Sequence, residues 1–143
     1  MRYSVAMTGE VEAAMRDHLI RDDGQEDVLV ATYVLSSGLE RTTALIRSII
    51  LPREGERHVH GNASFTSRYV LRAASEARAA GHGLVLLHSH PGAEGWQHLS
   101  GMDWETESEY ERVARTATTM PLLGMTLGGH DTAWSARFWL ART

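Results

Sequence analysis

A short apolar run that ends in two histidines constrains the fold of this chain more than any other feature. Residues 84–87 are Leu-Val-Leu-Leu, and His-Ser-His-Pro follows directly at positions 88–91. An apolar run of this length, preceded by glycines and closed by a proline, predicts a buried β-strand. Because side chains alternate along a strand, His88 and His90 leave one face and Ser89 leaves the other. Two imidazoles are therefore expected side by side at a strand end.

A carboxylate follows the histidine pair at a spacing that suits a metal site. Ser100 and Asp103 have the spacing of a helix N-cap and an acidic residue in the first turn, which would hold Asp103 facing the strand end. Two imidazoles and one carboxylate form a three-ligand zinc site whose fourth position stays open for water, as in catalytic zinc sites. The sequence therefore predicts one Zn²⁺ bound by His88, His90 and Asp103.

A second histidine pair with the same spacing, His58 and His60, is the rival metal site. It lies in a polar stretch, and no carboxylate follows it at a similar distance. A single histidine, His18, falls on the apolar face of a predicted helix over residues 8–19, where packing is the favoured role. The pair at positions 88 and 90 is therefore preferred.

The order His-Ser-His-Pro, a loop and Ser-x-x-Asp resembles the motif of the JAMM (JAB/MPN-plus) metalloproteases. Nine residues separate His90 from Ser100 where the common family pattern has seven, and the loop GAEGWQHL is similar to that of prokaryotic members associated with ubiquitin-like conjugation systems. The family consists of zinc-dependent isopeptidases that remove ubiquitin and ubiquitin-like proteins. The resemblance implies that His88, His90 and Asp103 hold the zinc and that Ser100 steadies the oxyanion.

The resemblance also implies a catalytic glutamate just after the first helix, and Glu26 stands at that place. Glu54 and Glu56 are the rival bases, but both fall in residues 52–64, which are predicted to be a loop. A base must be held within hydrogen-bond reach of the proton that it removes, which favours Glu26 at the start of a strand. Two residues of the 91–99 loop, Trp96 and Gln97, are expected to touch the substrate.

Hydrophobic periodicity predicts strands and helices in a mixed order. Strands are expected over residues 2–7, 28–35, 42–51, 84–87, 121–127 and 132–140, and helices over residues 8–19, 66–81 and 104–117. Negative charge in the first turns of the last helix, Glu107 included, is favoured by the helix dipole. Periodicity supports an α/β or α+β chain. The resemblance implies a mixed, largely antiparallel sheet flanked by helices, the JAMM/MPN type, which is cytidine-deaminase-like.

Length and composition narrow the class of protein. A chain of 143 residues suits one domain, here residues 1–143 as a single JAMM/MPN-type domain. Cysteine is absent, which excludes disulfides and cysteine-based metal sites. The net charge of −4 gives no basic field for nucleic acid. No apolar run is long enough to cross a bilayer and no signal-peptide pattern is present, so no membrane association and a cytoplasmic location are expected.

The predicted function is cleavage after the C-terminus of a ubiquitin-like protein, in deconjugation or in precursor processing. The implied partners are the ubiquitin-like protein or its conjugate and the activating and conjugating enzymes of the same system. Two alternatives remain open: a non-catalytic MPN-type scaffold that binds partner proteins, and a zinc hydrolase that acts on a sulfur-carrier protein or a small molecule. A DNA-repair-type relative is disfavoured by the acidic charge balance.

Overall fold

The computed structural model describes residues 2–60, 62–92, 101–129 and 133–140, and within them the chain forms three helices and eight strands. The helices are α1 (Gly9–Leu19), α2 (Ser67–Ala80) and α3 (Gly101–Thr118). The strands are β1 (Arg2–Ala6), β2 (Val28–Ser37), β3 (Arg41–Ile50), β4 (Arg57–His60), β5 (Asn62–Phe65), β6 (Gly83–His90), β7 (Leu122–Gly128) and β8 (Trp134–Trp139).

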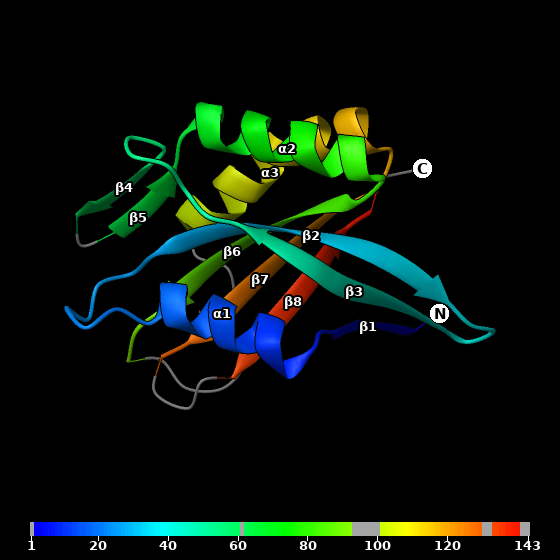
Figure 1. Cartoon of the computed structure of the whole chain (residues 1–143), viewed down its shortest axis with the longest axis horizontal. Helices are drawn as coiled ribbons and strands as arrows, with labels where there is room; N and C mark the ends of the chain where they lie inside the picture. Colours follow the sequence, from blue (N-terminus) through cyan, green and yellow to red (C-terminus); the bar gives the residue numbers. More distant parts are fainter. Residues whose placement is uncertain (1, 61, 93–100, 130–132, 141–143) are drawn as a thin grey trace.

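Six of the strands form one mixed sheet in the order β1-β3-β2-β6-β7-β8. β1 runs parallel to β3 and β6 runs parallel to β7, whereas the other neighbours are antiparallel. Helices α2 and α3 cover one face of this sheet and α1 covers the other (Figure 1). The predicted α/β class, with a mixed and largely antiparallel sheet between helices, is therefore confirmed.

The two faces of the sheet carry separate hydrophobic clusters. On the α1 side, Met15 and Leu19 pack against strand residues that include Leu87, and all three side chains are fully buried. On the α2 and α3 side, Tyr69 and Leu86 belong to the second cluster. Neighbouring residues of β6 thus serve opposite faces, as the alternation of a strand buried on both sides requires.

The helix ends follow local capping rules. Thr8 and Thr66 are the N-caps of α1 and α2, and their hydroxyl groups accept hydrogen bonds from the amides of Val11 and Tyr69. Gly81 ends α2 in the left-handed conformation, with φ of 73°, which glycine adopts without steric cost. The two threonines fix where α1 and α2 begin, and the Gly81 cap ends α2 shortly before β6 begins.

The outer strands of the sheet approach each other. β1 and β8 stand at opposite ends of the strand order, yet the rings of Tyr3 and Phe138 lie 5.2 Å apart between centroids. Twist accumulates from strand to strand, and here it curls the sheet most of the way toward a barrel.

The prediction of a loop over residues 52–64 was wrong in its second half. Residues of β4 and β5 pair antiparallel as a two-stranded sheet, with Arg57 opposite Phe65 and His60 opposite Asn62. Side chains along both strands alternate between exposed and half-buried. The charged and polar residues of this stretch hide that alternation in the sequence, because only one side of the hairpin is covered.

No helix in the described part of the chain combines the length and the apolar character needed to span a membrane.

Candidate metal centre

The end of β6 presents two imidazoles on one face of the sheet. His88 pairs in register with Val28 of β2, and the preceding residue on the same face, Leu86, belongs to the cluster under α2 and α3. His90, two residues further along, leaves the strand on the same side. Both histidines therefore face the layer that contains α3.

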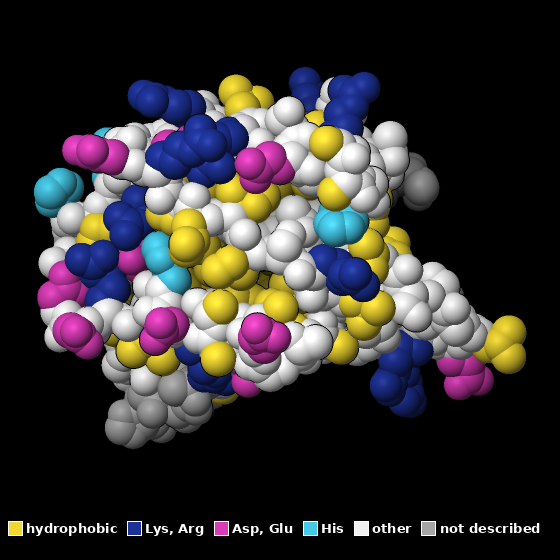
Figure 2. All heavy atoms as spheres, viewed as in Figure 1, with side chains coloured by type: hydrophobic (Ala, Val, Ile, Leu, Met, Phe, Trp, Pro, Cys, Tyr) yellow, Lys and Arg dark blue, Asp and Glu magenta, His cyan; other side chains and the backbone are white. Residues whose placement is uncertain are grey.

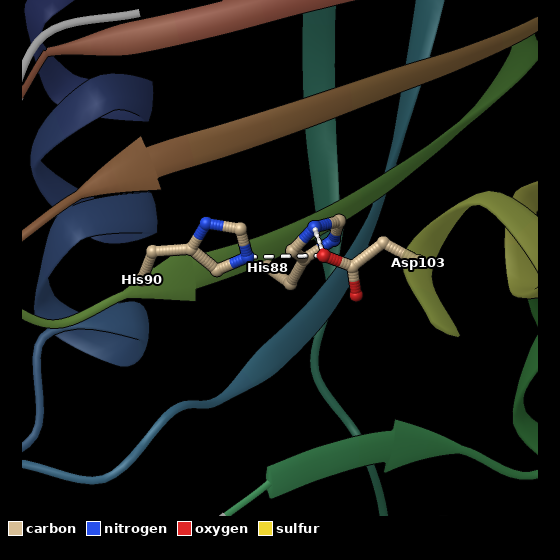
Figure 3. Close-up of side chains that lie close together, drawn as sticks. All are labelled: His88, His90 and Asp103. Atoms are coloured by element: carbon tan, nitrogen blue, oxygen red, sulfur yellow. Dashed lines mark hydrogen bonds and ion pairs between the residues drawn. The ribbon is translucent and has the colours of Figure 1, made fainter. Parts of the chain in front are cut away.

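Asp103 reaches both imidazoles from the first turn of α3. Its Oδ2 atom lies 3.0 Å from Nε2 of His88 and 3.0 Å from Nε2 of His90. Figure 3 shows the two rings on β6 directed toward the Asp103 carboxylate. The three candidate ligand atoms all lie within 4.8 Å of one another. The structure thus brings together the three residues that the sequence pattern selects.

The donor set fits zinc in chemistry and in spacing. Two imidazole nitrogens and one carboxylate oxygen are common zinc ligands, and ligand atoms around tetrahedral zinc are separated by roughly 3.3 Å. The observed nitrogen–oxygen distances of 3.0 Å are close to that value. The His90 and Asp103 side chains are 16% and 22% exposed, so solvent reaches the cluster on one side. In the part of the chain that the structure describes, no other group of His, Asp and Glu side chains meets the same geometric criterion.

Glu26 lines a small pocket together with the candidate ligands. It lies two residues before β2, is half-buried, and shares the pocket with His88 and Asp103. The pocket has a volume of about 10 Å³, which is room for one water-sized sphere. Of the three glutamates considered as a base, Glu26 is the one that shares a pocket with His88 and Asp103.

The residue after Glu26 anchors this stretch of backbone. Asp27 is buried, its amide donates to the Ser89 hydroxyl, and its carbonyl accepts from the Ser89 amide, each at 3.1 Å. Arg21 and Arg57 form ion pairs with its carboxylate at 3.1 Å and 2.9 Å. Because Asp27 is tied to the end of β6 in this way, Glu26 is held next to the strand that carries the histidines.

The electrostatics of Asp27 favour the ionised carboxylate. Burial alone would raise the pKa of Asp27, but hydrogen bonds from His18, the Val28 amide and Arg21, together with the charge of His18, outweigh burial and lower it. The His18 Nε2 atom also lies 2.8 Å from the Val28 carbonyl oxygen. His18 thus makes polar contacts with the start of β2, and among the residues that the structure describes it belongs to no cluster of candidate metal ligands.

The rival histidine pair has a different environment. His58 and His60 lie on β4, and both are exposed to solvent. Neither belongs to a cluster of candidate ligands among the residues that the structure describes. The preference for His88 and His90 therefore agrees with the geometry.

The two rival glutamates differ from each other. Glu54 is exposed, as expected for a loop residue. Glu56 is only 1% exposed and accepts hydrogen bonds from Arg72, which lower the pKa of its carboxyl to about 2. The prediction that Glu56 is a poorly held loop residue was therefore wrong. A carboxylate so strongly paired is a poor proton acceptor near neutral pH.

Three predicted site residues, Ser100, Trp96 and Gln97, lie outside the residues that the structure describes. Their roles as oxyanion donor and as substrate contacts stay predictions.

Glu107 is a member of this pocket that sequence reasoning placed only as a favourable charge near the helix start. Its side chain is buried and lines the same pocket as Glu26, His88 and Asp103. The available signal was its spacing, since residues four apart on a helix share a face. Its partner Arg137 lies on β8, thirty positions away, and no local pattern identifies that pairing.

Comparisons with known proteins add no family assignment. No protein-family model matches the chain, and no curated protein matches it at a significant level.

Proposed function

We propose that this protein is a zinc-dependent isopeptidase or peptidase of the JAMM/MPN type, which cleaves after the C-terminus of a ubiquitin-like protein. One observation carries the proposal: His88 and His90 at the end of a buried strand meet Asp103 from a helix, and Glu26 lines the same pocket. The mixed α/β sheet, with helices on both faces, is compatible with the JAMM/MPN, cytidine-deaminase-like fold that the motif resemblance implies.

His88, His90 and Asp103 would hold a single Zn²⁺, with solvent access on the side of the more exposed ligands. A zinc ion in such a site lowers the pKa of bound water toward about 7 and polarises a carbonyl oxygen. Both effects serve hydrolysis of an amide or isopeptide bond, whose carbonyl is a weak electrophile.

Glu26 would act as the general base. It accepts a proton from the attacking water and then delivers that proton to the departing amine, so one carboxylate serves both halves of the reaction. Its place beside His88 and the anchoring of Asp27 next to it support this assignment. General-base catalysis of this kind typically contributes about 10²–10⁴-fold to the rate.

Ser100 would donate a hydrogen bond to the oxyanion of the tetrahedral intermediate, an interaction worth about 3 kcal/mol for one well-placed donor. Trp96 and Gln97 would contact the substrate. The β4–β5 hairpin contributes Ala63 and Phe65 to the pocket that holds Glu26, so strand edges are available beside the candidate site. An extended substrate tail added to such an edge is a common mode of peptide recognition.

The proposed partners are a ubiquitin-like protein or its conjugate, with the activating and conjugating enzymes of the same system, in the cytoplasm. Arginine and acidic side chains are mixed over the face shown in Figure 2, which agrees with a protein partner better than with nucleic acid. The charge balance of −4 points in the same direction.

A panel of ubiquitin-like proteins fused through their C-termini to a reporter tests the proposal. Purified protein should cleave at least one fusion after the ubiquitin-like C-terminus. A chelator should stop cleavage and added zinc should restore it, whereas Glu26→Gln protein should keep its zinc and fail to cleave. If zinc is bound but no fusion is cut, one of the two alternatives applies, a binding scaffold or a hydrolase for other substrates.

A further inference from the structure

An ion pair with a buried glutamate connects α3 to β8, one helical turn from the candidate ligand Asp103. Glu107 lies one helical turn after Asp103 and is 1% exposed. Arg137 donates to both of its carboxylate oxygens, to Oε1 from Nε at 3.0 Å and to Oε2 from Nη2. Trp139 donates its indole N–H to Oε1 at 2.7 Å. We name this group, Glu107 with Arg137 and Trp139, the helix clamp.

The hydrogen bonds of the helix clamp direct the Glu107 carboxylate toward β8. Both of its oxygens accept hydrogen bonds from cationic or indole donors, although it lines the pocket that contains Glu26 and His88. Glu107 therefore has a holding role.

Gly124 makes the close approach of Glu107 possible. Gly124 of β7 is the register partner of Arg137 on β8, and the Glu107 carboxylate lies directly over this pair. A Cβ atom at position 124 would lie 2.1 Å from Oε1 of Glu107, which no real contact permits. Glu107 thus reaches across β7 to β8 only because position 124 has no side chain.

The clamp contacts α3 at two positions that follow Asp103, namely Trp104 and Glu107. Trp104, the residue after Asp103, stacks at a tilt against Trp139 with 5.8 Å between ring centroids. Trp139 therefore contacts the helix at Trp104 and at Glu107, and Asp103 lies between the clamp and the end of β6. These contacts determine how the first turns of α3 are rotated and how far they lie from the sheet.

We propose that Glu107 is a positioning residue that sets the place of the Asp103 carboxylate relative to His88 and His90. The inference rests on the proposed zinc site. A buried ion pair adds little stability over apolar side chains of the same size, but the directional hydrogen bonds from Arg137 and Trp139 hold the Glu107 carboxylate in one place against β8. Ligands for a metal must be held within about 0.5 Å of the productive geometry, which a hydrogen-bonded clamp one turn away provides.

Zinc affinity, measured by competition with a chromogenic chelator, tests the clamp independently of activity. Glu107→Gln keeps the size of the side chain but removes the charge that fixes Arg137. Gly124→Ala changes no charge and displaces Glu107 sterically. The matched control is Glu56→Gln, which breaks a buried glutamate–arginine pair with Arg72 and does not line the metal pocket.

Both clamp variants should bind zinc about 10–100-fold more weakly than wild type, the range seen when outer contacts of metal ligands are removed. Their visible spectra with Co²⁺ should also change, since absorption reports coordination geometry. Glu56→Gln should lose stability but keep wild-type zinc affinity and the wild-type Co²⁺ spectrum.

The results separate a failure of the proposed role of Glu107 from a failure of the proposed zinc site. If wild type binds zinc and the folded clamp variants bind it as tightly, with unchanged Co²⁺ spectra, Glu107 has no positioning role and the proposed function is unaffected. If wild type itself binds no zinc, the metal site and the proposed function fail, and the clamp fails with them. Should Glu107→Gln not fold, Gly124→Ala gives the deciding affinity.

Discussion

Two His-x-His pairs with the same spacing lie in this chain, and the structure gives them opposite environments. His88 and His90 end an eight-residue strand that is hydrogen-bonded on both sides, and a helix brings Asp103 to them. His58 and His60 lie on a four-residue strand of a two-stranded sheet and are exposed. The motif alone is therefore not a metal site. A rigid strand end facing a carboxylate on a neighbouring element is what distinguishes the first pair.

The largest difference between the two regions should appear in metal binding. His88→Ala protein should lose its single zinc and all cleavage activity, and Asp103→Ala should behave alike, because a three-ligand site tolerates the loss of a ligand poorly. His58→Ala, the matched change in the exposed pair, should keep one zinc per chain and full activity. Elemental analysis of the purified proteins measures their zinc content. Full zinc occupancy in His88→Ala would show that the wrong pair was chosen.

Replacing a glutamate in each of the two regions should have a somewhat smaller effect, which is expected in the catalytic rate. Glu26→Gln should lower kcat by about 10²–10⁴-fold while zinc content stays unchanged, because the amide cannot accept a proton. Glu54→Gln, in the exposed segment before β4, should stay within a few-fold of wild type. Steady-state kinetics with a cleavable fusion measures both. A normal rate for Glu26→Gln, together with a collapse for Glu54→Gln, would move the base to the other region.

A smaller effect is expected at the substrate side of the metal region. Trp96→Ala should raise KM several-fold, with zinc content and Tm nearly unchanged, if the indole touches only the substrate. Leu39→Ala, at an exposed position in the turn between β2 and β3, is the control and should alter neither KM nor kcat. A large fall in Tm for Trp96→Ala would identify a core residue and end the functional interpretation of the loop.

The smallest effect concerns the stability of the region before β4. The pKa of Glu56 is lowered from 4.5 to about 2 by Arg72, so its contribution to folding is complete above about pH 4.5 and is lost as the pH falls toward 2. Metal-free wild type should therefore lose stability over that range. Glu56→Gln should be less stable by on the order of 1–3 kcal/mol at neutral pH and should show a flatter acid dependence. Denaturant unfolding at several pH values measures it, and equal slopes for both proteins would contradict the assignment.

Local patterns in the sequence were enough to predict the strands of the main sheet and the helices that cover it. The apolar run before His88, the capping threonines and Gly81 each act within a few residues, so their consequences are visible without a structure. The candidate ligands were predictable for the same reason, because alternation along β6 and the first turn of α3 determine their directions.

The structural features that could not be predicted from the sequence depend on contacts between distant elements. The hairpin of β4 and β5 has a weak alternation because one side stays in solvent. Glu56 and Glu107 look like surface charges until Arg72 and Arg137 are placed beside them by the packing of other elements. Neither pairing has a spacing rule, so each had to be found in three dimensions.

Diffraction from crystals of the zinc-loaded protein, collected at the zinc absorption edge, tests the central claim most directly. The account predicts one anomalous peak per chain, about 2.0–2.2 Å from Nε2 of His88, Nε2 of His90 and a carboxylate oxygen of Asp103. A peak at His58 and His60, or no peak within bonding distance of His88 and His90, would contradict it.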